Sequence, residues 1–291
     1  MKEGPGVDKN AKKKRGLFLY IDIVFRKFLK LMQAGILYFL CSLPYLALCF
    51  FVISPTIMAC IGFNDMTFTP IGEYSAEQTK VLAQILYSII ITMFIFNFFG
   101  AGPVSAAYAY VTRCFTRGEH AWIGSDGWDK FKENFVQSLL LVVCDIVVFI
   151  LGFNAISFYR ALSAQTSIFV IASGLTMSLM FIYMVMHYYI YQIMVTYKCT
   201  FIELIKYSII TALAKLPITV LLTVITVGIF WLMVNFLSGN PLIFALLLGL
   251  IGLIFTRYPI EFYAARVIEK NIKAERKKEK KNRAKVTYIE E

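Results

Sequence analysis

Charged residues are scarce in this sequence. They make up 16% of its 291 residues, whereas soluble proteins average about 25%, and hydrophobic residues make up 59%. The sequence holds no HExxH, GxSxG or P-loop motif and only two histidines, so metal-dependent or nucleophilic chemistry has little to build on. We therefore expect a membrane protein that is not an enzyme and that binds neither a cofactor nor a metal.

The cysteines show no CxxC spacing, which argues against a zinc site and against a disulfide framework. They lie mostly in or beside apolar segments, and we interpret them as small buried apolar residues. The formal charge of +11 does not indicate nucleic acid binding, because the basic residues flank apolar runs instead of marking a soluble folded surface.

Six apolar runs are long enough to cross about 30 Å of hydrocarbon. They cover residues 33–54, 82–111, 136–158, 167–197, 216–237 and 242–265. Pro103 predicts a kink near one end of the second run. The sequence therefore predicts an all-α, multi-pass helix bundle that spans the bilayer about six times.

The chain divides into four predicted segments. Residues 1–15 form a basic segment, and 16–32 an amphipathic helix whose apolar residues recur every three or four positions, as in helices that lie in the membrane interface. Residues 33–265 form the six-span transmembrane domain, and 266–291 a highly charged, basic tail.

Basic residues gather on one side of the predicted bundle. Of the 29 Lys and Arg residues, nine precede the first run, four lie between the second and third, three between the fourth and fifth, and eleven from Arg257 onwards. Only Lys80 and Arg160 fall on the other side. The positive-inside rule then places both termini in the cytoplasm and the chain in the cell membrane.

A motif follows the second run. Residues 100–111 read GAGPVSAAYAYV and are followed by Arg117, Gly118 and Glu119, and then by residues 128–135, which read WDKFKENF. This order and spacing resemble the signature of the YesL-like family, bacterial multi-pass membrane proteins of unknown function. The resemblance covers about residues 82–214 and is looser elsewhere, because this chain has a longer N-terminal part, an acidic loop after the first run and a longer basic tail.

The resemblance implies an accessory role in sugar uptake. Such proteins are often encoded beside carbohydrate ABC importers in Gram-positive bacteria, so importer subunits are the implied partners in addition to the lipid bilayer. It assigns no catalytic residues and leaves the oligomeric state open.

Small residues mark the start of the motif. Gly102, Pro103, Ser105, Ala106 and Ala109 fall on neighbouring faces of one helix, where small side chains let another helix backbone approach closely. We interpret them as a packing motif. The alternative is that Pro103 frees backbone groups that bind a partner or gate a path.

Asp145 and His187 are the ionisable residues most clearly inside the apolar runs. At 1.5 Å per residue, they lie at depths of about 14 and 15 Å from the cytoplasmic ends of their runs, so they are able to meet. A structural hydrogen-bonded pair is one interpretation, and proton coupling is the other. Asn97, Asn154 and Asn235 are expected to link helices by hydrogen bonds.

Two further groups flank the bundle. Arg257 and Glu261 are four residues apart, which predicts a local ion pair or an anchor at the lipid headgroups. The loop between the second and third runs is either an interfacial aromatic belt or a docking surface for a partner. Its candidate residues are Arg117, Glu119, Trp122, Trp128, Phe131 and Phe135.

Three functions remain in competition. The first is a non-enzymatic accessory or regulatory subunit for carbohydrate uptake. The second is a transporter or channel in its own right, with Asp145 and His187 coupling it to protons; an ABC permease is a weak version, because the glycine of its ATPase-docking loop is misplaced here. The third, an intramembrane enzyme, lacks the motifs that it needs.

Overall fold

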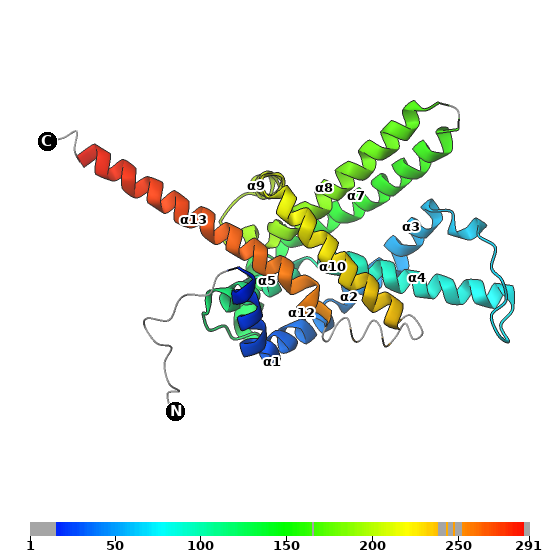
Figure 1. Cartoon of the computed structure of the whole chain (residues 1–291), viewed down its shortest axis with the longest axis horizontal. Helices are drawn as coiled ribbons and strands as arrows, with labels where there is room; N and C mark the ends of the chain where they lie inside the picture. Colours follow the sequence, from blue (N-terminus) through cyan, green and yellow to red (C-terminus); the bar gives the residue numbers. More distant parts are fainter. Residues whose placement is uncertain (1–15, 165, 238–242, 244–246, 248–251, 288–291) are drawn as a thin grey trace.

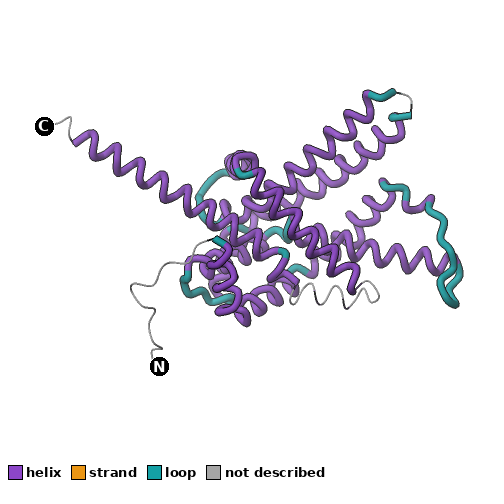
Figure 2. The backbone as a smooth tube through the Cα atoms, in the orientation of Figure 1, coloured by secondary structure: helices purple, strands orange, loops and turns teal. Residues whose placement is uncertain are grey.

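The computed structural model describes residues 16–164, 166–237, 243, 247 and 252–287, with the side chains of residues 236–237 and 273–287 excepted. Across these residues the regular elements are helices, and an isolated bridge between Ile71 and Tyr74 takes the place of a strand (Figure 2). The all-α prediction is therefore confirmed. The basic segment 1–15 lies outside the described residues.

The helices have the following bounds within the described residues. In chain order they are α1 (Leu17–Cys41), α2 (Leu43–Leu48), the π-helical turn η1 (Cys49–Ile53), α3 (Ser54–Cys60), the short η2 (Phe63–Asp65), α4 (Ala76–Phe98), α5 (Pro103–Arg117), α6 (Ser125–Glu133), α7 (Phe135–Leu162), α8 (Ile168–Met194), α9 (Phe201–Ala214), α10 (Leu216–Leu237), α12 (Leu253–Phe255) and α13 (Arg257–Thr287).

Five helical stretches among the described residues are long and apolar enough to cross a membrane. They are Leu43–Cys60, Ala76–Phe98, Phe135–Leu162, Ile168–Met194 and Leu216–Asn235. The protein is therefore an integral membrane protein with several membrane-crossing helices. The first half of the sixth predicted run, 242–265, lies largely outside the described residues.

The start of the bundle differs from its predicted boundaries. The first helix does not end at residue 32 but continues to Cys41, with one non-helical residue at Lys27, and the first membrane-crossing stretch begins at Leu43. The cause is Pro44, which has no N–H to donate to the carbonyl of Leu40 and so ends α1. An apolar run read from composition alone does not reveal where α1 ends.

The two ends of the bundle carry different elements. The start of α1, the α5–α6 pair and the far end of α13 lie at one end, whereas the α3–α4 connection and the tip of the α7–α8 hairpin lie at the other (Figure 1). Residues 266–287, which belong to the predicted basic tail, continue α13 as one helix that projects from the body.

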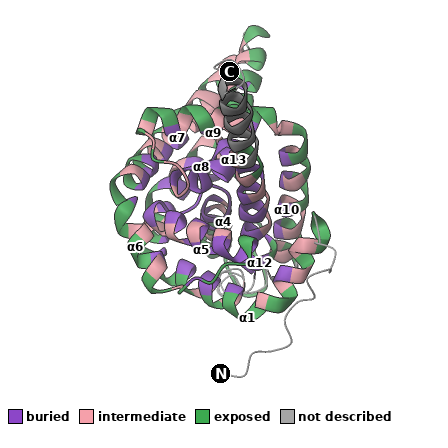
Figure 3. Ribbon diagram, turned by 90° about the vertical axis from the view of Figure 1, so that its left-hand side faces the viewer, coloured by how far each residue is buried: buried purple, intermediate pink, exposed green. Residues whose placement is uncertain are grey.

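The core forms around the second half of α8. Every residue from Met184 to Met194 is buried, and α5, α7, α9 and α13 pack against this helix. Buried residues therefore gather at the centre of the end-on view, and exposed residues surround them on α1, α6 and α7 (Figure 3). The outer half of α8 is largely exposed beside α7, as expected of a helix that faces lipid.

Candidate functional site

The second predicted run is broken, not kinked. α4 ends at Phe98 and α5 begins at Pro103, and the residues between them are buried. Gly100 and Gly102 have φ values of +92° and +56°, which L side chains rarely adopt. The break therefore depends on the glycines, and Pro103 only supplies a favourable first residue for α5.

The glycines also allow close packing. A Cβ atom at Gly102 would lie 2.6 Å from Val142 Cγ2 and 3.2 Å from the Ser138 carbonyl oxygen, so α7 approaches this backbone directly. Pro103, Ser105, Ala106 and Ala109 are buried on the same short helix. The structure thus brings the predicted small-residue motif into a close helix contact, with α7 on one side.

A serine holds the broken segment in place. Ser105 Oγ accepts a hydrogen bond of 2.6 Å from the Ala101 amide and lies 2.9 Å from the hydroxyl of Tyr38 on α1. The first contact satisfies the Ala101 amide, a backbone group that the break removes from the helical ladder. Three elements, α1, α5 and the break, are therefore joined at one point.

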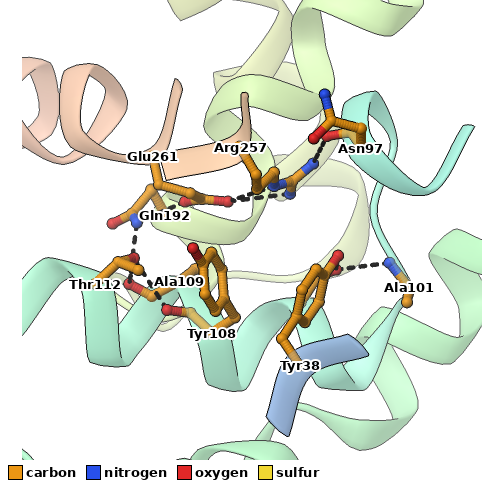
Figure 4. Close-up of polar contacts among 10 residues, drawn as sticks. Tyr38, Asn97, Ala101, Tyr108, Ala109, Thr112, Gln192, Arg257 and Glu261 are labelled. Atoms are coloured by element: carbon orange, nitrogen blue, oxygen red, sulfur yellow. Dashed lines mark hydrogen bonds and ion pairs between the residues drawn. The ribbon is translucent and has the colours of Figure 1, made fainter. Parts of the chain in front are cut away.

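Arg257 reaches the end of α4 from α13. Its side chain is fully buried, and its Nη1 donates a hydrogen bond of 2.8 Å to the Asn97 carbonyl oxygen (Figure 4). Its Nε also donates a hydrogen bond of 3.1 Å to Glu261 Oε1. The expected local ion pair is present, but Arg257 does not extend to the lipid headgroups, because its partners lie inside the bundle.

Gln192 completes this cluster from α8. Its Nε2 donates to Glu261 Oε2 at 2.7 Å and to the Ala109 carbonyl oxygen at 3.0 Å (Figure 4). Asn97 Oδ1 accepts a hydrogen bond of 2.8 Å from the Thr256 hydroxyl, which agrees with its expected linking role. Gln192 was not among the predicted residues; its position in an otherwise apolar run, among tyrosines, was the available signal.

Asn154 does not link helices as expected. Its Nδ2 donates to the Ile150 carbonyl oxygen of its own helix, and its side chain is exposed. The exposed Asn154 amide therefore makes its hydrogen bond within its own helix.

Asp145 on α7 and His187 on α8 meet inside the bundle. His187 Nε2 lies 2.9 Å from Asp145 Oδ1, and both side chains are almost completely buried. The Tyr183 hydroxyl donates a hydrogen bond of 2.6 Å to the same carboxylate oxygen. The equal depths read from the sequence therefore correspond to a real contact between the two helices.

Tyr191 lies beside both buried pairs, Arg257–Glu261 and Asp145–His187. The guanidinium carbon of Arg257 is 5.7 Å from the centroid of its ring, and the His187 ring centroid is 6.4 Å away. A cation near an aromatic face is stabilised by the negative charge density of the ring. The two pairs are thus neighbours and not independent sites.

The predicted docking residues lie on α5, on the loop that follows it, on α6 and at the start of α7. Arg117 Nη1 is 3.7 Å from Glu119 Oε1, and the exposed Trp128 stacks on Phe131 with ring centroids 5.1 Å apart. Trp122 is exposed in the loop, and Phe135 is exposed at the start of α7. These aromatic residues share one end of the molecule.

A groove of about 540 Å³ runs between α1, α5 and α6. Its lining is almost entirely apolar and includes Ala34 and Leu37 on α1, Ala107 on α5 and Trp128 and Phe131 on α6. Motif residues from both α5 and α6 therefore face one surface.

No group of three or more His, Cys, Asp or Glu side chains suited to a metal ion occurs in the described part of the chain. Comparison with protein-family models, with curated proteins and with solved structures finds no match.

Proposed function

We propose that this integral membrane protein is a non-enzymatic accessory or regulatory component of carbohydrate uptake of the ABC type. The resemblance of residues 100–135 to the YesL-like signature supports the link to sugar import. The concentration of Lys and Arg beside α1, α5–α6 and α13 supports a cytoplasmic placement of that end in the cell membrane.

The observation that carries this proposal is the exposed aromatic surface on α6 and the loop before it. Trp122 and Trp128 have 69% and 58% of their surface exposed, although tryptophan usually buries most of its ring. Tryptophan is enriched among the residues that dominate the energy of protein interfaces. A partner subunit that covers this surface would bury both rings beside the apolar groove.

The test is a pull-down from native membranes in a mild detergent, with mass spectrometry of the copurified proteins. The variant Trp128→Ala/Phe131→Ala removes the stacked pair. Trp231→Ala, at an exposed position on α10, is the matched control. We expect importer subunits to copurify with the native protein and the control and to be lost with the double variant.

Recovery of the protein alone in every sample would contradict the accessory role. Equal recovery of importer subunits with all three proteins would place the contact somewhere other than α6.

A second candidate function is proton-coupled transport, favoured by the contact between Asp145 and His187. A buried carboxylate and imidazole in a membrane helix pair are the usual parts of a proton relay. Transport of a sugar is disfavoured by the grooves of about 540 and 360 Å³, because apolar side chains line them. Sugar hydroxyls need polar partners.

Transport is tested by proton flux into liposomes that contain the purified protein, under an imposed membrane potential. Flux that disappears in Asp145→Asn would favour this function. Liposomes as tight as empty ones would count against it.

A further inference from the structure

The groove of about 540 Å³ between α1, α5 and α6 begins among the membrane-crossing helices. Its lining on α5 starts at Val104, next to the break where Gly102 packs on Ser138 and Val142 of α7. Val142 lies about two turns inside that membrane-crossing helix. From Val104 the groove follows α5 to Val111, about 10 Å at 1.5 Å per residue, towards the end of the bundle that carries α6 and the start of α1 (Figure 1). The groove therefore runs from the hydrocarbon to one edge of the membrane.

The α1 wall of the groove is continuous with a face that lipid covers. Leu37 and Cys41 line the groove and are exposed, and the first membrane-crossing stretch begins at Leu43, two residues after Cys41. Leu40 and Leu43 are 52% and 49% exposed beside them. Apolar surface at the entry to a membrane is stable against acyl chains and not against water. The lipid chains of the bilayer therefore have direct access to the groove.

Lysine side chains stand at the other end of the groove. Lys30 lies one turn before Ala34 and two turns before Leu37 on one face of α1, and both of these residues line the groove. Lys132 Nζ lies 5.8 Å from the centroid of the Trp128 ring, which lines the groove from α6. Lysine and tryptophan side chains commonly lie at the level of the lipid headgroups. The groove is thus apolar along its length and cationic at one rim.

The acidic side chains of α6 have partners of their own. Asp126 Oδ2 accepts a hydrogen bond of 2.9 Å from the backbone amide in the preceding loop, and Glu133 forms an ion pair with Lys130. Asp129 pairs with Lys132, but these two side chains are 73% and 57% exposed, and an ion pair in water is weak. Lys132 is therefore able to turn from Asp129 to a second anion at the rim of the groove.

These features choose among the occupants that a bilayer supplies. A membrane-spanning helix of a partner, about 10 Å wide and about 30 Å long, is too large for the groove. An acyl chain is narrow enough, and lysines at the membrane surface attract anionic headgroups. We propose that the groove binds one acyl chain of an anionic phospholipid, with the headgroup at Lys30 and Lys132. This site does not rest on the proposed function, because the lipid lies within the groove whereas the partner covers the exposed rings of Trp122 and Trp128.

The test uses the full-length protein, purified in a mild detergent and freed of lipid. Phosphatidylglycerol or phosphatidylcholine with the same acyl chains is then added, and native mass spectrometry counts the lipid molecules that stay bound to each protein molecule. We expect a first site that takes one phosphatidylglycerol. Phosphatidylcholine should bind there more weakly, by roughly fivefold for each lysine that the headgroup engages.

Two variants change the groove and leave its lysines in place. Ala107→Trp fills the groove from its α5 side, and Leu37→Gln makes its α1 wall polar at a position that is 41% exposed, so that the fold is little disturbed. We expect both to lose the first site for either lipid. Ala214→Trp, at the exposed end of α9, is the matched control and should keep it.

A third variant changes the charge and leaves the groove open. Lys30→Gln/Lys132→Gln should keep a first site but bind the two phospholipids equally. Lys206→Gln, at an exposed position on α9, is its control and should keep the preference for phosphatidylglycerol.

Three results would overturn the proposal. The first is a native protein that holds no lipid, or several without a distinct first site. The second is a first site that survives in both groove variants, and the third is equal affinity of the native protein for the two phospholipids. Each of these would leave the pull-down of importer subunits unaffected, because Trp128 and Phe131 are unchanged in every protein compared here.

Discussion

Arg257 Nη1 donates a hydrogen bond of 2.8 Å to the carbonyl oxygen of Asn97, at the C-terminal end of α4. The last carbonyls of a helix lack intrahelical donors and carry the negative end of its dipole. A buried guanidinium at this position therefore satisfies the open end of α4, while Glu261 balances its charge. The break between α4 and α5 is thus stabilised from a helix about 160 residues away in sequence.

Removing one member of the buried pair should be costly. Arg257→Met leaves the Glu261 carboxylate buried without its cation, and we expect the free energy of unfolding in detergent to fall by about 3–5 kcal/mol. The joint change Arg257→Met/Glu261→Met should cost less than either single change, since no charge is then left unpaired.

The control for this pair is Arg26→Met. Arg26 pairs with Asp22 at the same spacing of four residues, but its side chain is 62% exposed. We expect a loss below about 1 kcal/mol. Equal losses for Arg26→Met and Arg257→Met would contradict the importance of burial.

Gly100 should tolerate no side chain. A Cβ atom there would lie 2.5 Å from Ser105 Oγ and 2.9 Å from Tyr191 Cε2, and its φ of +92° is strained for alanine. We expect Gly100→Ala to lower the free energy of unfolding by about 2 kcal/mol or more. The measurement is the midpoint temperature of thermal unfolding, which should fall. Gly124→Ala is the control, because its φ is −74° and nothing lies within 4 Å of the added atom; a similar loss in both would argue against the packing at the break.

The two ends of the bundle should react differently with a thiol reagent that does not cross membranes. We expect Glu73→Cys, in the α3–α4 connection, to be labelled in intact cells. We expect His120→Cys, in the α5–α6 loop, to be labelled only after the cells are permeabilised, because the basic residues place that end in the cytoplasm. The opposite pattern would invert the orientation, and the unsubstituted protein supplies the background from the native cysteines.

The N-terminus of α9 should open at low pH. Hydrogen bonds from the Thr200 amide and hydroxyl to the carboxylate lower the pKa of Glu203. A carboxyl group whose pKa is lower in the folded state contributes stability above its ordinary pKa of about 4.3 and loses it as the pH falls through the lowered value. Exchange of the Thr200 amide hydrogen, corrected for its intrinsic pH dependence, should therefore become faster as the pH falls through the lowered pKa of Glu203. Glu203→Gln should remove this pH dependence. If the dependence persists in that variant, another group is its cause.

Much of the architecture follows from composition and periodicity. Long apolar runs leave the backbone little choice in a bilayer except the helix, which is why the all-α prediction is confirmed and why the runs at 136–158 and 216–237 correspond closely to α7 and α10. The end of α1 at Cys41 and the break at Gly100 were missed, because apolar residues continue across both and only local backbone geometry interrupts the helix.

The candidate site was predictable in part. Counting residues along two antiparallel helices placed Asp145 and His187 at the same depth, and the structure puts them in contact. The contact between Arg257 and Asn97 was not predictable, because it depends on how α13 packs against the end of α4 and not on spacing within one helix.

The continuous helix α13 has a mechanical consequence. It runs from the buried Arg257 to Thr287, a length of about 46 Å at 1.5 Å per residue, and its far end lies outside the body of the protein. An uninterrupted helix resists bending, so it acts as a lever with its short arm among the transmembrane helices. A force on the projecting end would be transmitted along the helix and would move Arg257 relative to the carbonyl oxygens of α4. A molecule that binds the tail would therefore act on the centre of the membrane domain from outside it.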